Sequence, residues 1–179
     1  MSVSLPLISA APDEDRRYIR HMVAHHDQGI ELARLAVTRA HGSHLRALAA
    51  LMVASQSGEN RIFISWWSGW FDDPMPICAG EELTAMPGYL TADQMADARN
   101  ASGTAFDAVF VRLMSQHHAG AVSMADVEWH SRGDPRLRLM AHAIRHEQQG
   151  EVALMNRVQG IEAVRQATRN MFADNLDRR

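Results

Sequence analysis

The sequence predicts an all-α protein, a four-helix bundle made from two copies of one helical hairpin. The first observation is an internal repeat with an offset of 92 residues, which runs without a gap from Asp15 to Phe63 in its first copy. The matched pairs are Met22 and Met114, His25 and His117, His26 and His118, Gln56 and Gln148, and Glu59 and Glu151. The second observation is that apolar residues recur at helical spacing, with no alternating pattern typical of strands.

The length and composition are those of one domain with a substantial core, because the chain has 179 residues, of which 46% are hydrophobic. We expect a single domain over residues 1–179. Residues 13–70 would form the first hairpin, residues 71–101 the crossover loop with a short helix, and residues 102–170 the second hairpin.

The first hairpin is predicted from its helix boundaries. The acidic residues 13–15 suit a helix N-terminus, so we expect a helix from there to about Ala40. Gly42 and Ser43 supply a stop and a new N-cap for a second helix, which runs to about Trp70.

The crossover and the second hairpin follow from prolines, glycines and caps. Residues 72–88 are rich in Pro and Gly and predict a loop. Thr91 and Gln94 form a capping box that begins a short helix. A third long helix is expected over about residues 104–131, and Pro135 begins a fourth that continues as far as Asn170.

The composition excludes several classes of function. The net charge is −3 and no basic run occurs, which argues against a nucleic-acid partner. No apolar run is long enough to span a membrane. Residues 1–12 lack the basic region of a signal peptide, so a cytoplasmic location is expected on that ground. The most informative feature is the enrichment in His and Met, with 10 and 11 residues.

The paired histidines are the first candidates for metal ligands. In a helix, Met22 lies one turn before His25 and His26, and Met114 repeats this arrangement before His117 and His118. Thioether and imidazole together suit copper, above all Cu(I). The alternative is that the histidines are hydrogen-bonded core residues and the methionines fill gaps between helices.

Four polar residues interrupt the apolar stripes of the second and fourth helices: Gln56, Glu59, Gln148 and Glu151. A buried carboxylate must be paired, protonated or bound to metal. Glu59 is therefore expected to orient His25 or His26, and Glu151 to orient His117 or His118, as partners of metal ligands. The alternative is a polar network that fixes the helix register and binds no ligand.

No catalytic or organic-cofactor residues are predicted. The Glu-x-x-His motif of ferritin-like di-metal centres is absent from the buried faces, which argues against an oxidase. His21 and His142 each lie four residues before another histidine and are predicted to be surface residues, with accessory metal binding as the alternative. The single Cys78 excludes an intramolecular disulfide and is predicted to be inert, although metal binding is the sharper alternative.

Aromatic residues gather at the end of the second helix, where Trp66, Trp67 and Trp70 lie close to Phe63 and Phe71. We expect this cluster to close one end of the bundle. A homodimer interface is the alternative, because aromatic residues are enriched at such interfaces.

The motifs of the second hairpin resemble a bacterial family, domain of unknown function 305. Residues 110–125 read FVRLMSQHHAGAVSMA and are followed by Gln148-Gln-Gly-Glu151. The connector MPGYLTADQM, residues 86–95, is also similar to that of the family. The first copy fits less closely, because Asp27-Gln28-Gly29 replaces the step of small residues.

The resemblance covers residues 15–160 and implies a ferritin-like four-helix bundle, often in exported proteins or lipoproteins. It also implies copper binding through Met and His, which some relatives use in copper tolerance. We therefore expect a non-catalytic copper-binding bundle, with zinc or iron as other candidate ions. The alternatives are a di-metal redox enzyme and a structural bundle without metal.

Overall fold

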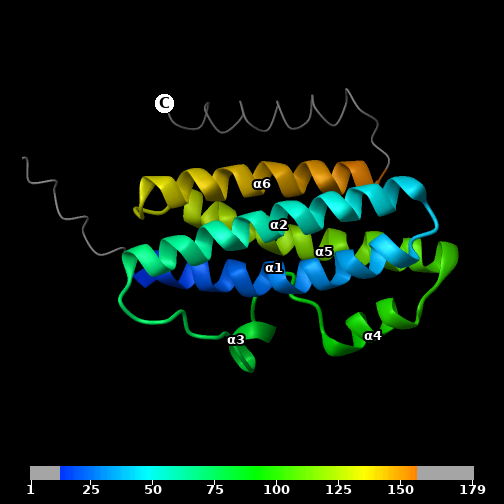
Figure 1. Ribbon diagram of the computed structural model, residues 1–179, viewed down its shortest axis with the longest axis horizontal. Helices are drawn as coiled ribbons and strands as arrows, with labels where there is room; N and C mark the ends of the chain where they lie inside the picture. The colour runs from blue at the N-terminus through cyan, green and yellow to red at the C-terminus, as the bar shows by residue number, and fades with distance from the viewer. Residues whose placement is uncertain (1–12, 157–179) are drawn as a thin grey trace, which may run out of the picture.

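Four long helices run side by side along the length of the molecule in the computed structural model, which describes residues 13–156 (Figure 1). They are α1 (Asp13–Arg39), α2 (Ser43–Trp70), α5 (Gly103–Trp129) and α6 (Pro135–Met155). No β-strand occurs within residues 13–156. The all-α prediction is confirmed.

The helices pair as two hairpins. The helix α1 packs extensively on α2, and α5 packs extensively on α6, as the internal repeat predicts. Between the hairpins, most contacts join α1 to α5, whereas α2 and α6 touch much less. The seam between α1 and α5 is therefore the main junction of the two repeats.

The helix ends follow the predicted caps closely. The capping box is confirmed, since the Gln94 N–H donates to Thr91 Oγ1 at 3.2 Å and the Thr91 N–H donates to Gln94 Oε1 at 2.9 Å. Asp134 caps α6 by accepting from the Arg136 N–H at 2.8 Å. The N-cap of α2 is Gly42 rather than the predicted Ser43.

The crossover contains two short helices, α3 (Glu81–Thr84) and α4 (Ala92–Asn100), which lie on the side of α1 away from α6 (Figure 1). The predicted short helix is α4, and α3 is an additional one that the sequence did not indicate, because a four-residue helix is too short to show periodicity. The helix α6 ends at Met155, and the predicted continuation to Asn170 falls outside the described residues.

The segment 86–90 of the crossover (the crossover strap) lies directly on α1 and α5. Gly88 has φ +73°, and a Cβ there would lie 2.7 Å from the Gln116 carbonyl oxygen on α5. Gly120 leaves room for the strap, since a Cβ at this position would lie 1.9 Å from the Pro87 carbonyl oxygen. On α1, Gln28 donates to the Leu90 carbonyl at 2.9 Å and accepts from the Leu90 N–H at 2.7 Å.

The apolar core is divided into two clusters along the bundle. One surrounds Phe106 and Phe110, and the other surrounds Ile19 and Phe63. On all four long helices, a polar stretch separates the residues of one cluster from those of the other. This polar layer contains His25, His26, Gln56, Glu59, His117, His118, Gln148 and Glu151.

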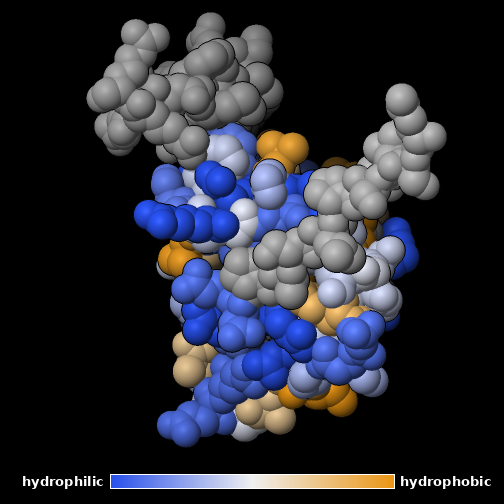
Figure 2. Space-filling view, turned by 90° about the vertical axis from the view of Figure 1, so that its left-hand side faces the viewer, coloured by the Kyte–Doolittle hydropathy of each residue, from blue (hydrophilic) through white to orange (hydrophobic). Residues whose placement is uncertain are grey.

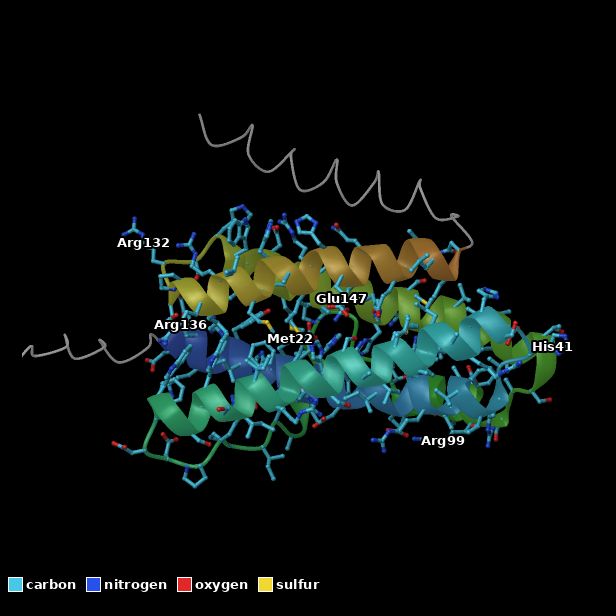
Figure 3. The ribbon with its side chains drawn as sticks, turned by 45° about the horizontal axis from the view of Figure 1, so that its top comes forward. Met22, His41, Arg99, Arg132, Arg136 and Glu147 are labelled. Carbon is cyan, nitrogen blue, oxygen red and sulfur yellow. The ribbon has the colours of Figure 1, made fainter. Side chains whose placement is uncertain are left out.

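The aromatic cluster at the end of α2 is covered by arginines. Trp66 and Trp70 stack with centroids 5.2 Å apart, while the guanidinium of Arg16 lies 4.2 Å from the Phe71 ring centre. Arg136, at the start of α6 (Figure 3), lies 4.7 Å from the ring centre of Trp70. Figure 2 shows this end of the molecule, where hydrophilic residues predominate and hydrophobic ones form separate patches. These contacts favour the closing role, while the homodimer stays a prediction.

Candidate metal centre

Eight of the ten predicted site residues lie in the polar layer, and Met22 and Met114 lie in the two apolar clusters on either side of it. The four histidines are fully buried, as are Met22 and Met114, each one turn before its histidine pair. Figure 3 shows Met22 in the interior of the bundle. Because the ten residues come from all four long helices, the folded bundle is required to assemble them.

In each hairpin, one histidine forms a hydrogen bond with the glutamate of the same hairpin. His26 Nε2 lies 2.7 Å from Glu59 Oε2, and His118 Nε2 lies 2.7 Å from Glu151 Oε2. The sequence left two histidines open as the partner of each glutamate. The structure pairs the second histidine of each doublet, and the two copies agree.

The first histidine of each doublet bonds to a backbone carbonyl. His25 Nε2 lies 3.1 Å from the Pro87 carbonyl oxygen of the crossover strap, and His117 Nε2 lies 3.0 Å from the His25 carbonyl oxygen. The two rings meet across the α1–α5 seam, with centroids 3.8 Å apart. The repeat thus brings two imidazoles from different hairpins into contact.

These hydrogen bonds fix the tautomer of the imidazoles. A carbonyl oxygen only accepts, so His25 and His117 must carry their proton on Nε2. An ionised Glu59 or Glu151 does the same for His26 or His118. The Nδ1 atoms of all four histidines are buried and have no hydrogen-bond partner among the described residues. Each Nδ1 therefore keeps an unused lone pair, which is the form that binds a metal.

Burial keeps the imidazoles of His25, His26 and His117 neutral. It lowers the pKa of His25 and that of His26 to about 3, and the neighbouring histidines add to both effects. The pKa of His117 falls well below its usual value for the same reasons. Since metal binding competes with protons for nitrogen, these rings are ready to bind a cation at neutral pH.

Glu147 on α6 adds a third carboxyl group to the polar layer, next to Glu59 and Glu151. Burial raises the pKa of Glu59 to about 7, and the charge of Glu151 contributes. Glu147 forms a side-chain hydrogen bond with Glu59 and another with Ser55, and it lies between α6 and α2 (Figure 3). The sequence prediction missed Glu147 because its repeat counterpart is Ser55, so the offset of 92 does not mark it.

The two glutamines complete the set of unpaired polar atoms. Both amide atoms of Gln56 and of Gln148 are buried without a hydrogen-bond partner in the described part of the chain. Gly29 allows this packing, since a Cβ there would lie 2.6 Å from Gln56 Oε1 and 2.8 Å from His117 Cε1. A buried polar atom without a partner costs about 1–3 kcal/mol, so a ligand that satisfied these atoms would stabilise the fold.

The donor set fits a soft cation better than a hard one, because imidazole nitrogens and thioethers outnumber free carboxylate oxygens. Within residues 13–156, only His21, Cys78 and Glu82 bring three His, Cys or acidic ligand atoms within 4.8 Å of one another. The polar layer is therefore no closed cage of histidine and carboxylate. An ion in it would need the Met22 or Met114 thioether or a turn of the imidazoles.

Two further histidines, His21 and His142, were predicted to be surface residues, but the structure shows both to be half-buried. His21 is half-buried, and its Nε2 lies 2.9 Å from Glu82 Oε1 on α3. His142 is also half-buried, with its ring centre 4.4 Å from that of His146. The prediction was wrong because a sequence contains no sign of the crossover or of the ring contacts that cover these positions.

The comparison with protein families identifies the chain. The family described as "Domain of unknown function (DUF305)" matches residues 15–159. The chain belongs to the DUF305 family. Its all-helical fold agrees with that of the solved members, and the predicted resemblance to this family is confirmed.

Three solved structures illustrate the similarity. A DUF305 fragment from Deinococcus radiodurans has a TM-score of 0.74 at 26% identity, over 84% of this chain and 97% of that chain. A DUF305 "putative secreted protein" from Streptomyces coelicolor has a TM-score of 0.73 at 24% identity, over 81% and 91%. CopM in its Cu(I)-bound form has a TM-score of 0.65 at 26% identity, over 80% and 93%. Structures of CopM with Cu(II) and with Ag also match.

The remaining comparisons concern curated proteins and location. No curated protein matches the chain. The expected cytoplasmic location gains no support, since the Streptomyces DUF305 structure is described as secreted. None of the helices in the described residues is both long and apolar enough to cross a membrane.

Proposed function

We propose that this DUF305 protein binds copper, chiefly as Cu(I), in the polar layer and without catalysing a reaction. The observation that carries the proposal is the set of four buried Nδ1 lone pairs, together with a buried methionine one helical turn before each histidine pair. Such atoms are costly in a core unless a ligand uses them.

The residues divide into ligands and supporting groups. His25 and His117, whose rings meet across the seam, would be central nitrogen ligands through Nδ1. His26 and His118 supply further nitrogens, and Glu59 and Glu151 hold their tautomer as outer partners of a metal site. Met22 and Met114 would be the soft co-ligands, with the Gln56 and Gln148 amide oxygens as weaker ones.

The choice of Cu(I) follows from ligand softness. Thioethers select Cu(I), whereas the imidazoles alone would suit zinc or iron as well. CopM, which has the same fold, has structures with Cu(I), Cu(II) and Ag. Silver(I) is a soft monovalent ion like Cu(I), which agrees with this choice.

A di-metal redox centre receives less support. Such centres use carboxylates from facing helices as metal ligands. Here the Glu59 and Glu151 carboxylates each hold a histidine at 2.7 Å instead.

The test is an anaerobic titration of metal-free protein with Cu(I), in competition with a chromophoric chelator. We expect tight binding of at least one equivalent, and its loss in the double variant His25→Ala with His26→Ala. A matched control is His41→Ala with His44→Ala, which removes two exposed histidines from the far end of the bundle. Unchanged stoichiometry in the His25/His26 variant would refute the site.

Two further measurements separate the alternatives. A melting temperature unaffected by Cu(I) would favour a structural bundle, because a ligand of the native state must raise stability. Iron or manganese in protein purified without a tag, together with oxygen consumption, would favour the redox enzyme.

A further inference from the structure

A second cluster of metal-ligating side chains lies outside the polar layer. His21 on α1, Cys78 in the loop after α2, and Glu82 on α3 place their ligand atoms within 4.8 Å of one another. The cluster joins segments about 60 residues apart in the chain. Figure 1 shows α3 beside α1, where the crossover returns to the first hairpin.

Docking of α3 accounts for only part of this arrangement. The Glu82 carboxylate accepts from Arg20 and lies 2.9 Å from His21 Nε2, so these contacts already hold α3 on α1. They do not require a thiol. Yet Cys78 is buried, and its sulfur points at α1, where it lies 3.7 Å from the Arg20 carbonyl oxygen.

The donor set has the composition of a zinc-class site. A thiolate, an imidazole and a carboxylate are three ligands that zinc uses in proteins, and three protein ligands leave a fourth position for water. His21 and Glu82 are only half-buried, so an ion can reach them from solvent. The second oxygen of Glu82 remains available to the ion while Arg20 holds the first.

We propose that His21, Cys78 and Glu82 form a second metal site, which takes a borderline divalent ion of the zinc class. On binding, the thiol loses its proton to solvent, a sulfur–metal bond forms, and no electron is transferred. Burial raises the pKa of the Cys78 thiol, so the metal-free protein carries the proton that binding releases. This site is independent of copper binding in the polar layer.

The test is a titration of the reduced, metal-free full chain with Co²⁺, a spectroscopic substitute for zinc. Because Cys78 is the single cysteine of the chain, a thiolate-to-cobalt charge-transfer band must come from it. We expect the band to saturate at one cobalt per chain and to vanish when one equivalent of Zn²⁺ is added. Native mass spectrometry should show one ion on one chain.

Three variants identify the ligands. Cys78→Ser should abolish the band, while His21→Gln and Glu82→Gln should each weaken cobalt binding tenfold or more. The two glutamine variants keep hydrogen-bonding groups between α1 and α3, and circular dichroism checks that they fold. The matched control is Glu81→Gln, the exposed neighbour on the same short helix, which should bind cobalt like the parent protein.

Several outcomes would overturn the proposal. Equal cobalt affinity in the parent protein and in both glutamine variants would mean that the thiol binds alone. A metal bridging two chains, or no band at all, would leave the cluster as a docking contact. If Cu(I) displaced cobalt and Zn²⁺ did not, the zinc class would be wrong. The variant His25→Ala with His26→Ala should keep the band, so failure of either site is distinguishable.

Discussion

The two hairpins carry the same residues in the polar layer but do not use them identically. His117 donates to the carbonyl of His25, so a symmetric molecule would have His25 donate to the carbonyl of His117. Instead, His25 bonds to Pro87 of the crossover strap. Gly88 of the same strap lies against α5, since a Cβ there would lie 2.9 Å from the His117 carbonyl oxygen.

The cause of the difference is visible in one repeat position. Gln28 of the first copy corresponds to Gly120 of the second at the offset of 92. Gln28 hydrogen-bonds to the strap, and Gly120 leaves room for it. One crossover strap therefore lies at the contact between the His25 and His117 rings. The polar-layer residues of each hairpin form a half-site, and the strap makes the surroundings of the two half-sites different.

The largest expected effect is that of filling the space that Gly120 leaves for the strap. Gly120→Ala places a Cβ against the Pro87 carbonyl, and overpacking of this kind costs about 1–3 kcal/mol. Chemical denaturation should show a loss of stability of about that size, although alanine favours a helix.

The companion variant Gln28→Ala should also cost about 1–3 kcal/mol in stability, because it leaves Leu90 backbone groups unpaired. No loss in either variant would mean that the strap does not hold this position in solution.

Acid should unfold the protein through the polar layer. The pKa of His25 and that of His26 are about 3 in the folded state, below the ordinary value of 6.5. The unfolded chain therefore binds more protons between pH 6.5 and 3, and stability falls as the pH falls through this window. Glu59 acts oppositely between pH 4.5 and 7, because its pKa is raised to about 7.

The variant Glu59→Gln isolates that opposing contribution. Without the carboxyl, the free energy of unfolding should rise more steeply with pH between 4.5 and 7, by up to about 1.4 kcal/mol per pH unit. Denaturation curves at several pH values measure the slope. An unchanged slope would show that Glu59 titrates alike in the folded and unfolded chains.

The two thioethers provide a direct comparison of the half-sites. Met22→Leu and Met114→Leu nearly preserve volume, so each should cost less than about 1.5 kcal/mol in stability. Each should weaken Cu(I) binding by about tenfold, which corresponds to roughly 1.4 kcal/mol. Competition titrations measure the affinities. A loss in one variant alone would show that copper occupies only one half-site, and no loss in either would remove methionine from the ligand set.

The sequence predicts the fold and the polar layer because the internal repeat contains the pattern of each in two copies. Matching His and Gln–Glu motifs at a fixed offset place polar residues at one level of all four helices, and the structure has that layer. The repeat could not predict contacts that only one copy makes. The strap on His25, the Glu147 contact with Ser55 and the helix α3 all break the repeat.

The cluster of His21, Cys78 and Glu82 could not be predicted from the sequence for a related reason. His21 and Cys78 are 57 residues apart, and neither has a counterpart of its kind at the offset of 92. Helical spacing along one segment cannot reveal which loop folds back onto it. Only the packing of the crossover on α1 brings the two side chains together.

The smallest effect concerns the matched glycines Gly58 and Gly150, which lie beyond the reach of the strap. A Cβ at Gly58 would meet nothing nearer than 3.7 Å, and one at Gly150 nothing within 4 Å. Both residues lie inside helices, where alanine is favoured over glycine by about 0.8–1 kcal/mol. Gly58→Ala and Gly150→Ala should therefore stabilise the protein by similar amounts, as thermal and chemical denaturation can measure. Opposite signs in the two variants would show that the hairpins differ even where the crossover is absent, so the strap could not account for all of their asymmetry.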